Sequence, residues 1–332
     1  MTIVDIVAAI MFVGIVAYAI FGGADFGSGF WDLIGGNAKK GGSLRALIDH
    51  SIGPVWEANH VWLIFILVFL WTGFPAGFAA IVTTLSLPLA FAAVGITLRG
   101  AGFAFRKFSS QVRFARLFGV IFASSSVLTP FFLGTVAGAV AGGRVPAEGY
   151  GDRWTSWTGP SSLVGGALAV LTCAFLAGVF LVADANRAQK VELVEQLRVR
   201  VIRLALVAGV VVAGGALPLR ADAPTLFHQL NSRGLVLVVT SAVAGLVTVW
   251  ALYERRFELA RGSAVVAVGS VVIGWGVAQY PWLLTDKLRL AAAAGARPTL
   301  IGLVIVGALA AAIVVPSLAW LYRLVRRPEW SR

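Results

Sequence analysis

The sequence predicts an all-α, polytopic membrane protein with about nine transmembrane helices, folded as a single integral membrane domain over residues 1–332. Hydrophobic residues make up 59% of the chain and charged residues only 13%, against about 45–50% and about 25% in soluble globular proteins. The mean hydropathy is +0.88. A soluble domain of this length cannot bury so much apolar surface, so lipid must cover it.

Nine apolar runs are long enough to cross about 30 Å of hydrocarbon. They cover residues 5–23, 55–73, 77–98, 115–141, 161–183, 201–219, 234–252, 264–283 and 298–322. Only residues 73–76 separate the second run from the third, which predicts a tight hairpin. Residues 24–54 are expected to form a loop, and residues 185–200 a helical extension outside the membrane.

Lys and Arg residues alternate between the connections. Twenty of the 27 lie in one set of alternate connections, and the other seven lie in the remaining set. The richer set comprises residues 24–54, 99–116, 184–203, 253–262 and the tail after 322. Because cytoplasmic loops gather Lys and Arg, we expect this set in the cytoplasm, with the N-terminus outside and the C-terminus inside. The same bias accounts for the net charge of +12, so no nucleic-acid partner is expected.

The residues that could bind a metal or haem are few. Cys173 is the single cysteine, which excludes a disulfide framework, a multi-cysteine zinc site and an iron–sulfur cluster. Haem axial ligands are usually His, Met, Cys or Tyr, and the chain has only His50, His60 and His228, with Met11 as the one internal methionine. Availability alone supports a Met11–His60 pair, so we assign no metal site and no haem ligand to this chain.

Ionisable side chains at membrane depth are costly and are therefore candidates for function. The first candidate is Asp25, at the end of the first apolar run, in Gly22-Gly23-Ala24-Asp25-Phe26-Gly27-Ser28-Gly29. The four glycines allow helices to approach closely. The sequence leaves open the alternative that Asp25 lies in a solvated turn.

The second candidate is Glu57, in Ser51-Ile52-Gly53-Pro54-Val55-Trp56-Glu57-Ala58-Asn59-His60-Val61-Trp62. Glu57 falls near the first turn of the second helix, where the helix dipole favours the ionised carboxylate while burial opposes it. This balance suits a group that takes up and releases protons. His60 follows three residues later on the same helix face and is a candidate to exchange a proton with Glu57. The alternative is that His60 is a hydrogen-bonded polar residue in a helix interface.

These two segments, about 25 residues apart, resemble subunit II of cytochrome bd-type quinol oxidases. A third element, Leu98-Arg99-Gly100-Ala101-Gly102-Phe103-Ala104-Phe105-Arg106, is similar to the segment that ends the third helix in that family. The motifs cover the first third of the chain. Their order and spacing make the resemblance specific, whereas a lone glycine motif would not.

The resemblance implies two four-helix bundles plus one peripheral helix, paired with a subunit I in the bacterial cytoplasmic membrane. Subunit I would carry haem b and haem d-type groups, and subunit II would bind no haem. The complex would oxidise quinol and reduce dioxygen to water with cytoplasmic protons, without pumping. A structural quinone, an oxygen path and small accessory subunits are features that the resemblance leaves open.

By position, Glu57 matches an acidic residue of the family's proton path, and Asp25 matches the acidic position after the first helix. Trp62 matches a tryptophan beside that path, Arg99 matches a basic residue at the end of the third helix, and His60 occupies a variable polar position. The resemblance thus implies a proton path through Glu57, Asp25 and His60, lined by Trp62 and Arg99. The alternative is a secondary transporter or channel with an intramembrane carboxylate; no matching pair of broken helices supports it.

Overall fold

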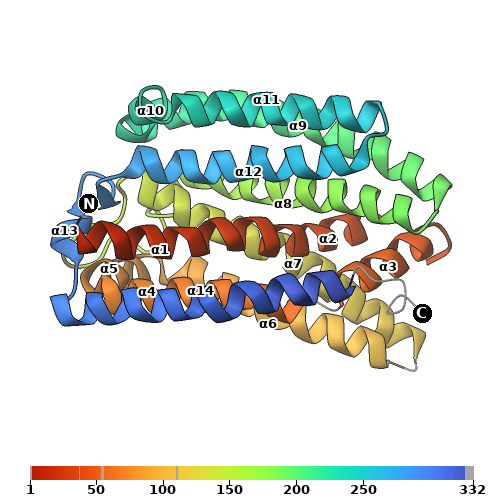
Figure 1. Ribbon diagram of the computed structural model, residues 1–332, viewed down its shortest axis with the longest axis horizontal. Coiled ribbons are helices and arrows are strands. Elements are labelled where there is room, and N and C mark those ends of the chain that lie inside the picture. Colours follow the sequence, from red (N-terminus) through yellow and green to blue (C-terminus); the bar gives the residue numbers. More distant parts are fainter. Residues whose placement is uncertain (1, 37, 54–55, 110, 326–332) are drawn as a thin grey trace.

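The computed structural model describes residues 2–36, 38–53, 56–109 and 111–325 (Figure 1). Pro54 and Val55 of the second motif lie outside the described residues. The elements are α1 (Ile3–Ala17), the π-helix η1 (Tyr18–Gly22), α2 (Gly23–Leu33), α3 (Ala38–Ile52), α4 (Trp56–Gly73), α5 (Pro75–Thr84), α6 (Ser86–Phe108), α7 (Val112–Ala141), α8 (Pro160–Arg187), α9 (Val191–Asp222), α10 (Pro224–Leu230), α11 (Leu235–Tyr253), α12 (Phe257–Gln279), β1 (Trp282–Leu284), β2 (Leu288–Arg289), α13 (Leu290–Ala293) and α14 (Arg297–Val325).

Within the described ranges, nine helices are long and apolar enough to cross a membrane. They correspond one to one to the nine predicted runs, so the predicted fold class is confirmed. The first of them is the continuous segment α1–η1–α2, which extends over 31 residues. β1 and β2 pair as a small antiparallel hairpin between α12 and α13.

The long helices pack in two groups of four. The segment α1–η1–α2 packs against α4 and α7, and α6 packs against α7; in the second group, α8 contacts α9 and α12, and α11 contacts α12 and α9. α8 joins the groups by packing on α2 and α7, and α14 lies against α1 and α4. The start of α1 and the end of α14 lie at opposite ends of the bundle (Figure 1). We call the end with α3 and the end of α14 the basic end.

Glycine permits the closest helix contacts. A Cβ on Gly27 of α2 would lie 1.8 Å from the Cys173 carbonyl oxygen of α8, and one on Gly134 of α7 would lie 2.4 Å from the Gly165 carbonyl oxygen. Neither site has room for any side chain. The same α2–α8 contact is fixed by the Trp31 indole, whose Nε1 donates to the Ala174 carbonyl at 2.7 Å.

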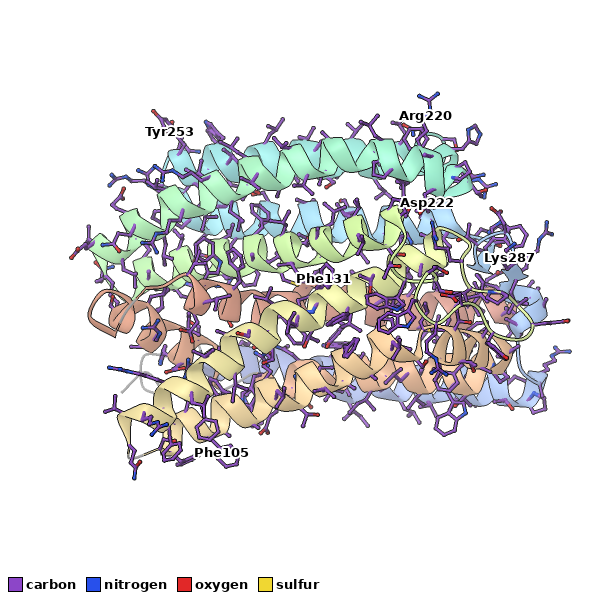
Figure 2. The ribbon with its side chains drawn as sticks, turned by 180° about the vertical axis from the view of Figure 1, so that it is seen from behind. Phe105, Phe131, Arg220, Asp222, Tyr253 and Lys287 are labelled. Carbon is purple, nitrogen blue, oxygen red and sulfur yellow. The ribbon has the colours of Figure 1, made fainter. Side chains whose placement is uncertain are left out.

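An ion pair connects helices at the end opposite the basic end. Arg144, just after α7, pairs with Asp222 at the end of α9. The second oxygen of Asp222 accepts a hydrogen bond from the Ser161 backbone amide at 3.0 Å, in the first turn of α8. Figure 2 shows Asp222 together with Arg220 and Lys287 toward this end, with Tyr253 and Phe105 toward the other.

The predicted loop over residues 24–54 is wrong. The structure continues the first helix through α2 to Leu33 and then forms α3 over most of the remaining segment. Glycine-rich α2 is a poor helix former on its own, but it is buried between α7 and α8. Tertiary packing therefore overrides its low helix propensity.

The third run is also not one helix. It divides at Leu85 into α5 and α6, and α4 and α5 form the expected tight turn at Phe74. Pro88 explains the break, because its nitrogen cannot donate to the Thr84 carbonyl and its ring crowds that carbonyl. The predicted extension at 185–200 belongs instead to the ends of α8 and α9, which meet in a turn where Gln189 has a φ of 56°.

Candidate functional site

Asp25 and Arg99 form an ion pair inside the first four-helix group. The Arg99 Nη2 atom donates to Asp25 Oδ1 at 2.5 Å, and the side chains are 1% and 2% exposed for Arg99 and Asp25, respectively. Asp25 lies in α2 and Arg99 lies in α6. The solvated turn considered for Asp25 is thereby excluded.

Aromatic rings enclose this pair. The Arg99 guanidinium carbon lies 5.0 Å from the centroid of the Phe26 ring and 5.3 Å from that of Phe122, distances at which a cation is attracted to a ring face. The His60 ring centroid lies 5.9 Å from that of Phe26 and 6.4 Å from that of Tyr18. Phe26 therefore lies next to both the Arg99 guanidinium and the His60 ring.

Several buried polar atoms around Phe26 have no hydrogen-bond partner among the described residues. They are Asp25 Oδ2, Arg99 Nε and Nη1, His60 Nδ1 and the Tyr18 hydroxyl. Buried polar groups normally find a partner in the protein or in an ordered water molecule. A cluster of donors and acceptors of this kind is suited to binding water.

A π-helix leads directly into the site. η1 spans Tyr18–Gly22 and precedes α2, which carries Asp25. π-bulges frequently occur at functional sites. From α4, the Asn59 side-chain amide donates to the Phe21 carbonyl of η1 at 3.3 Å, and Asn59 is 3% exposed. This contact joins η1 to the helix that carries His60.

Glu57 and Trp62 do not join the buried pair. Glu57 lies in the first turn of α4 with its side chain exposed. Trp62, two residues after His60, packs its ring 6.4 Å from that of Phe65. The structure therefore brings together Asp25, Arg99 and His60, and it places Glu57 on the surface.

A second ion-pair cluster lies at the basic end. Asp32 of α2 is 4% exposed and accepts from Arg45 Nε of α3 at 2.7 Å. Arg106 of α6 pairs with Asp32 and also with Asp49 of α3. These bonds hold the amphipathic helix α3 against the ends of α2 and α6.

A cavity of about 460 Å³ opens beside Asp25. Its lining is mainly apolar and comes from η1, α2, α3, α4, α8, α12 and α14. The polar residues that line it are Asp25, Ser28, Ser51, Asn59, Asp184, Arg261 and Arg323.

The three histidines and Met11 lie in different settings. His50 and His228 are exposed. Met11 shares a core cluster with Phe69, which follows His60 by nine residues on α4, a rise of about 13 Å. This position of Met11 gives no support to a Met11–His60 pair. Among the described residues, no three His, Cys, Asp or Glu side chains gather where they could hold a metal ion.

Sequence reasoning missed Tyr18, Asn59 and Asp184. Tyr18 and Asn59 resemble ordinary residues of apolar helices, and only the packing of η1 against α4 brings them to Asp25. Asp184 carries a detectable signal, because it is a carboxylate at the end of the fifth apolar run. Asp184 directly precedes the charged segment, residues 185–200, that is expected outside the membrane.

Comparisons with known proteins agree on one family. The family model for cytochrome bd terminal oxidase subunit II matches residues 3–325. Cytochrome bd ubiquinol oxidase subunit 2 of Bacillus subtilis (strain 168) is 27% identical over 132 residues, which cover 40% of this chain and 37% of the relative. The alignment thus spans well under half the length of that relative. A chain of the bd oxidase structure from Geobacillus thermodenitrificans superposes with a TM-score of 0.83 at 25% identity, covering 98% of this chain and 99% of that one.

Proposed function

Because the chain belongs to the cytochrome bd terminal oxidase subunit II family, we propose that it is the haem-free membrane subunit of an oxidase that oxidises quinol and reduces dioxygen. Its partner in this proposal is a subunit I that carries haem b and haem d-type groups. In this proposal the electron chemistry belongs to that partner. The transporter alternative has no support from the family match.

Within this complex, we assign to the chain a path for protons. Reduction of dioxygen to water consumes protons at a buried site, and lipid offers none, so protein groups must carry them. The observation that supports this role is the Asp25–Arg99 pair, an ionisable pair within the membrane-spanning helices. Such pairs are rare in membrane segments and mark ion and proton pathways.

The geometry of Asp25 suits proton uptake. Oδ1 accepts from Arg99, while Oδ2 has no partner among the described residues. A proton can therefore be bound at Oδ2 while Oδ1 keeps its bond to the guanidinium, which stays charged. Arg99 acts here as the positioning group, and the unpartnered atoms of Asp25, Arg99 and His60 are each suited to bind a water molecule.

Glu57 would pass protons onward to subunit I. It shares an exposed stripe of α4 with Val61, Ile64 and Val68, at the i, i+4, i+7 and i+11 spacing of one helix face. An ionised carboxylate facing lipid is costly, so this stripe is better suited to contact a protein. If subunit I packs against this stripe, Glu57 lies at the interface between the two subunits.

Replacing Glu57 with Gln tests this role. The amide keeps the size and hydrogen-bonding capacity of the side chain but cannot exchange a proton as an acid. We expect steady-state oxygen consumption by the assembled complex to fall by roughly tenfold or more, with unchanged haem content. Glu57→Asp should retain partial activity, because the carboxyl group is kept but its reach is one methylene shorter. Normal assembly of the Gln variant with the parental rate across near-neutral pH would refute the role of Glu57.

We also propose that the basic end faces the cytoplasm. The excess of Lys and Arg in the connections at this end supports that orientation. Reporter domains fused after Arg203 and after Arg327 should both be active in the cytoplasm, and one fused after Arg153 should be active outside. An external reporter after Arg327 would contradict both the orientation and a proton entry at the basic end.

A further inference from the structure

The cavity beside Asp25 has carboxylates on two of its walls. Asp25 contributes from α2 and Asp184 from α8, and Arg261 and Arg323 contribute from α12 and α14. α8 and α12 lie side by side toward the basic end (Figure 1). The volume of about 460 Å³ is many times the ~30 Å³ that one water molecule occupies in the liquid.

Asp25 presents an unsatisfied atom beside this space. It is 4% exposed, it lines the cavity, and its Oδ2 has no partner among the described residues. A buried acceptor that lies next to a cavity with further polar groups satisfies the condition for ordered water. Ser28 and Asn59 also line the cavity and can hydrogen-bond such water.

Asp184 lies in an ion-pair network near the surface. It accepts from Arg187 at 3.0 Å and from Arg261 at 3.3 Å, and its side chain is 22% exposed. Arg187 also pairs with Glu258 at 2.9 Å. The Arg261 guanidinium carbon lies 4.4 Å from the centroid of the Phe180 ring. Asp184 therefore touches both the outer charged groups and the cavity.

We propose that this cavity holds the chain of water molecules by which protons enter and reach Asp25, and that Asp184 is the carboxylate that collects them at the outer end. The inference rests on the proposed function and adds to it the place of entry. Each transfer breaks one O–H bond and forms another, from hydronium to Asp184, then through water to Asp25 Oδ2. No electron moves in these steps.

The two acids stand in different electrostatic settings. Arg187 on its own helix and Arg261 on α12 pair with Asp184, and Glu258 pairs with Arg187. Arg323 of α14 and Asp25 of α2, which is paired with Arg99, line the same cavity. The pairs with Arg187 and Arg261 hold the Asp184 carboxylate at the outer end of the cavity. An ionised carboxylate is the form that accepts a proton.

The test compares Asp184→Asn with Glu258→Gln in the assembled complex. Both replace a carboxylate that pairs with Arg187, but only Asp184 lines the cavity. We expect Asp184→Asn to slow oxygen consumption several-fold, with a deficit that grows as pH rises and protons become scarce, and with unchanged haem content. Glu258→Gln should keep the parental rate and pH profile.

A second pair of variants leaves every charge in place. Ala319 lines the cavity from α14, whereas Ala312 is an exposed residue of the same helix that does not line it. Ala319→Phe should displace water and reproduce the pH-dependent slowing, and Ala312→Phe should not. If Asp184→Asn assembles poorly, this pair decides the question.

The outcomes separate the inference from the function on which it rests. The entry route would be overturned if Asp184→Asn and Ala319→Phe both kept the parental rate and pH profile while Asp25→Asn was slow. That outcome would leave the proton role of Asp25 intact. A parental rate in Asp25→Asn as well would overturn the proposed function itself. Slowing in Asp184→Asn and Ala319→Phe but not in their controls would support the route.

Discussion

Replacing Arg99 with Met should greatly reduce the amount of assembled protein. Arg99 is 1% exposed and forms the ion pair with Asp25 at 2.5 Å. Removing one partner of a buried pair leaves an uncompensated charge and costs about 3–5 kcal/mol, a large share of a typical total stability of about 5–15 kcal/mol. We expect a lower yield and a lower thermal midpoint for the purified complex.

A double substitution separates the charge from the packing. Arg99→Met combined with Asp25→Asn leaves no buried charge at this site, so it should recover a substantial part of the lost yield and thermal midpoint. Arg99→Lys retains the charge but loses the planar fork of donors, and we expect it to fall between the parent and Arg99→Met. If Arg99→Met is as stable as the parent, the pair does not stabilise the fold.

Gly27→Ala should disrupt the packing of α2 on α8. The added Cβ would lie 1.8 Å from the Cys173 carbonyl oxygen and 2.3 Å from its carbon. Both are backbone atoms, so the helices must separate, and overpacking of this kind costs about 1–3 kcal/mol or more. The movement would also widen the gap between Trp31 and Ala174. The expected result is a clear fall in the thermal midpoint and in yield.

Gly209 provides the matched control. It lies within α9, and a Cβ there would meet nothing within 4 Å. Gly209→Ala should be neutral or slightly stabilising, because Ala is the better helix former by about 0.8–1.0 kcal/mol. Equal thermal midpoints for Gly27→Ala and Gly209→Ala would show that the close α2–α8 contact is not needed for stability.

The membrane helices were predictable because one strong physical signal defines them. Apolar length sets the number of spans, and the nine long apolar helices among the described residues follow it closely. The break at Leu85 and the helical state of α2 were not predicted. The break depends on one proline, Pro88, inside an otherwise continuous apolar run. α2 is helical because of its neighbours α7 and α8, which are distant from it in the chain.

The site was predictable only in part, for a similar reason. The cost of a charge in lipid singled out Asp25, and the family resemblance added Arg99, which proves to be its ion-pair partner. Tyr18 and Asp184 reach the same region through helix packing, which a pattern along the chain does not encode. For Glu57, the sequence marked the residue but not its position on the exposed stripe of α4.

The central claim is that protons for dioxygen reduction pass through Asp25. The most direct test is proton uptake during a single turnover, when the fully reduced complex in sealed vesicles is mixed with dioxygen and a pH indicator reports from the side of the basic end. In Asp25→Asn with full haem content, we predict that proton uptake is slowed roughly tenfold or more and that the haem oxidation steps that require a proton are slowed with it. Proton uptake at the parental rate in that variant would contradict the account.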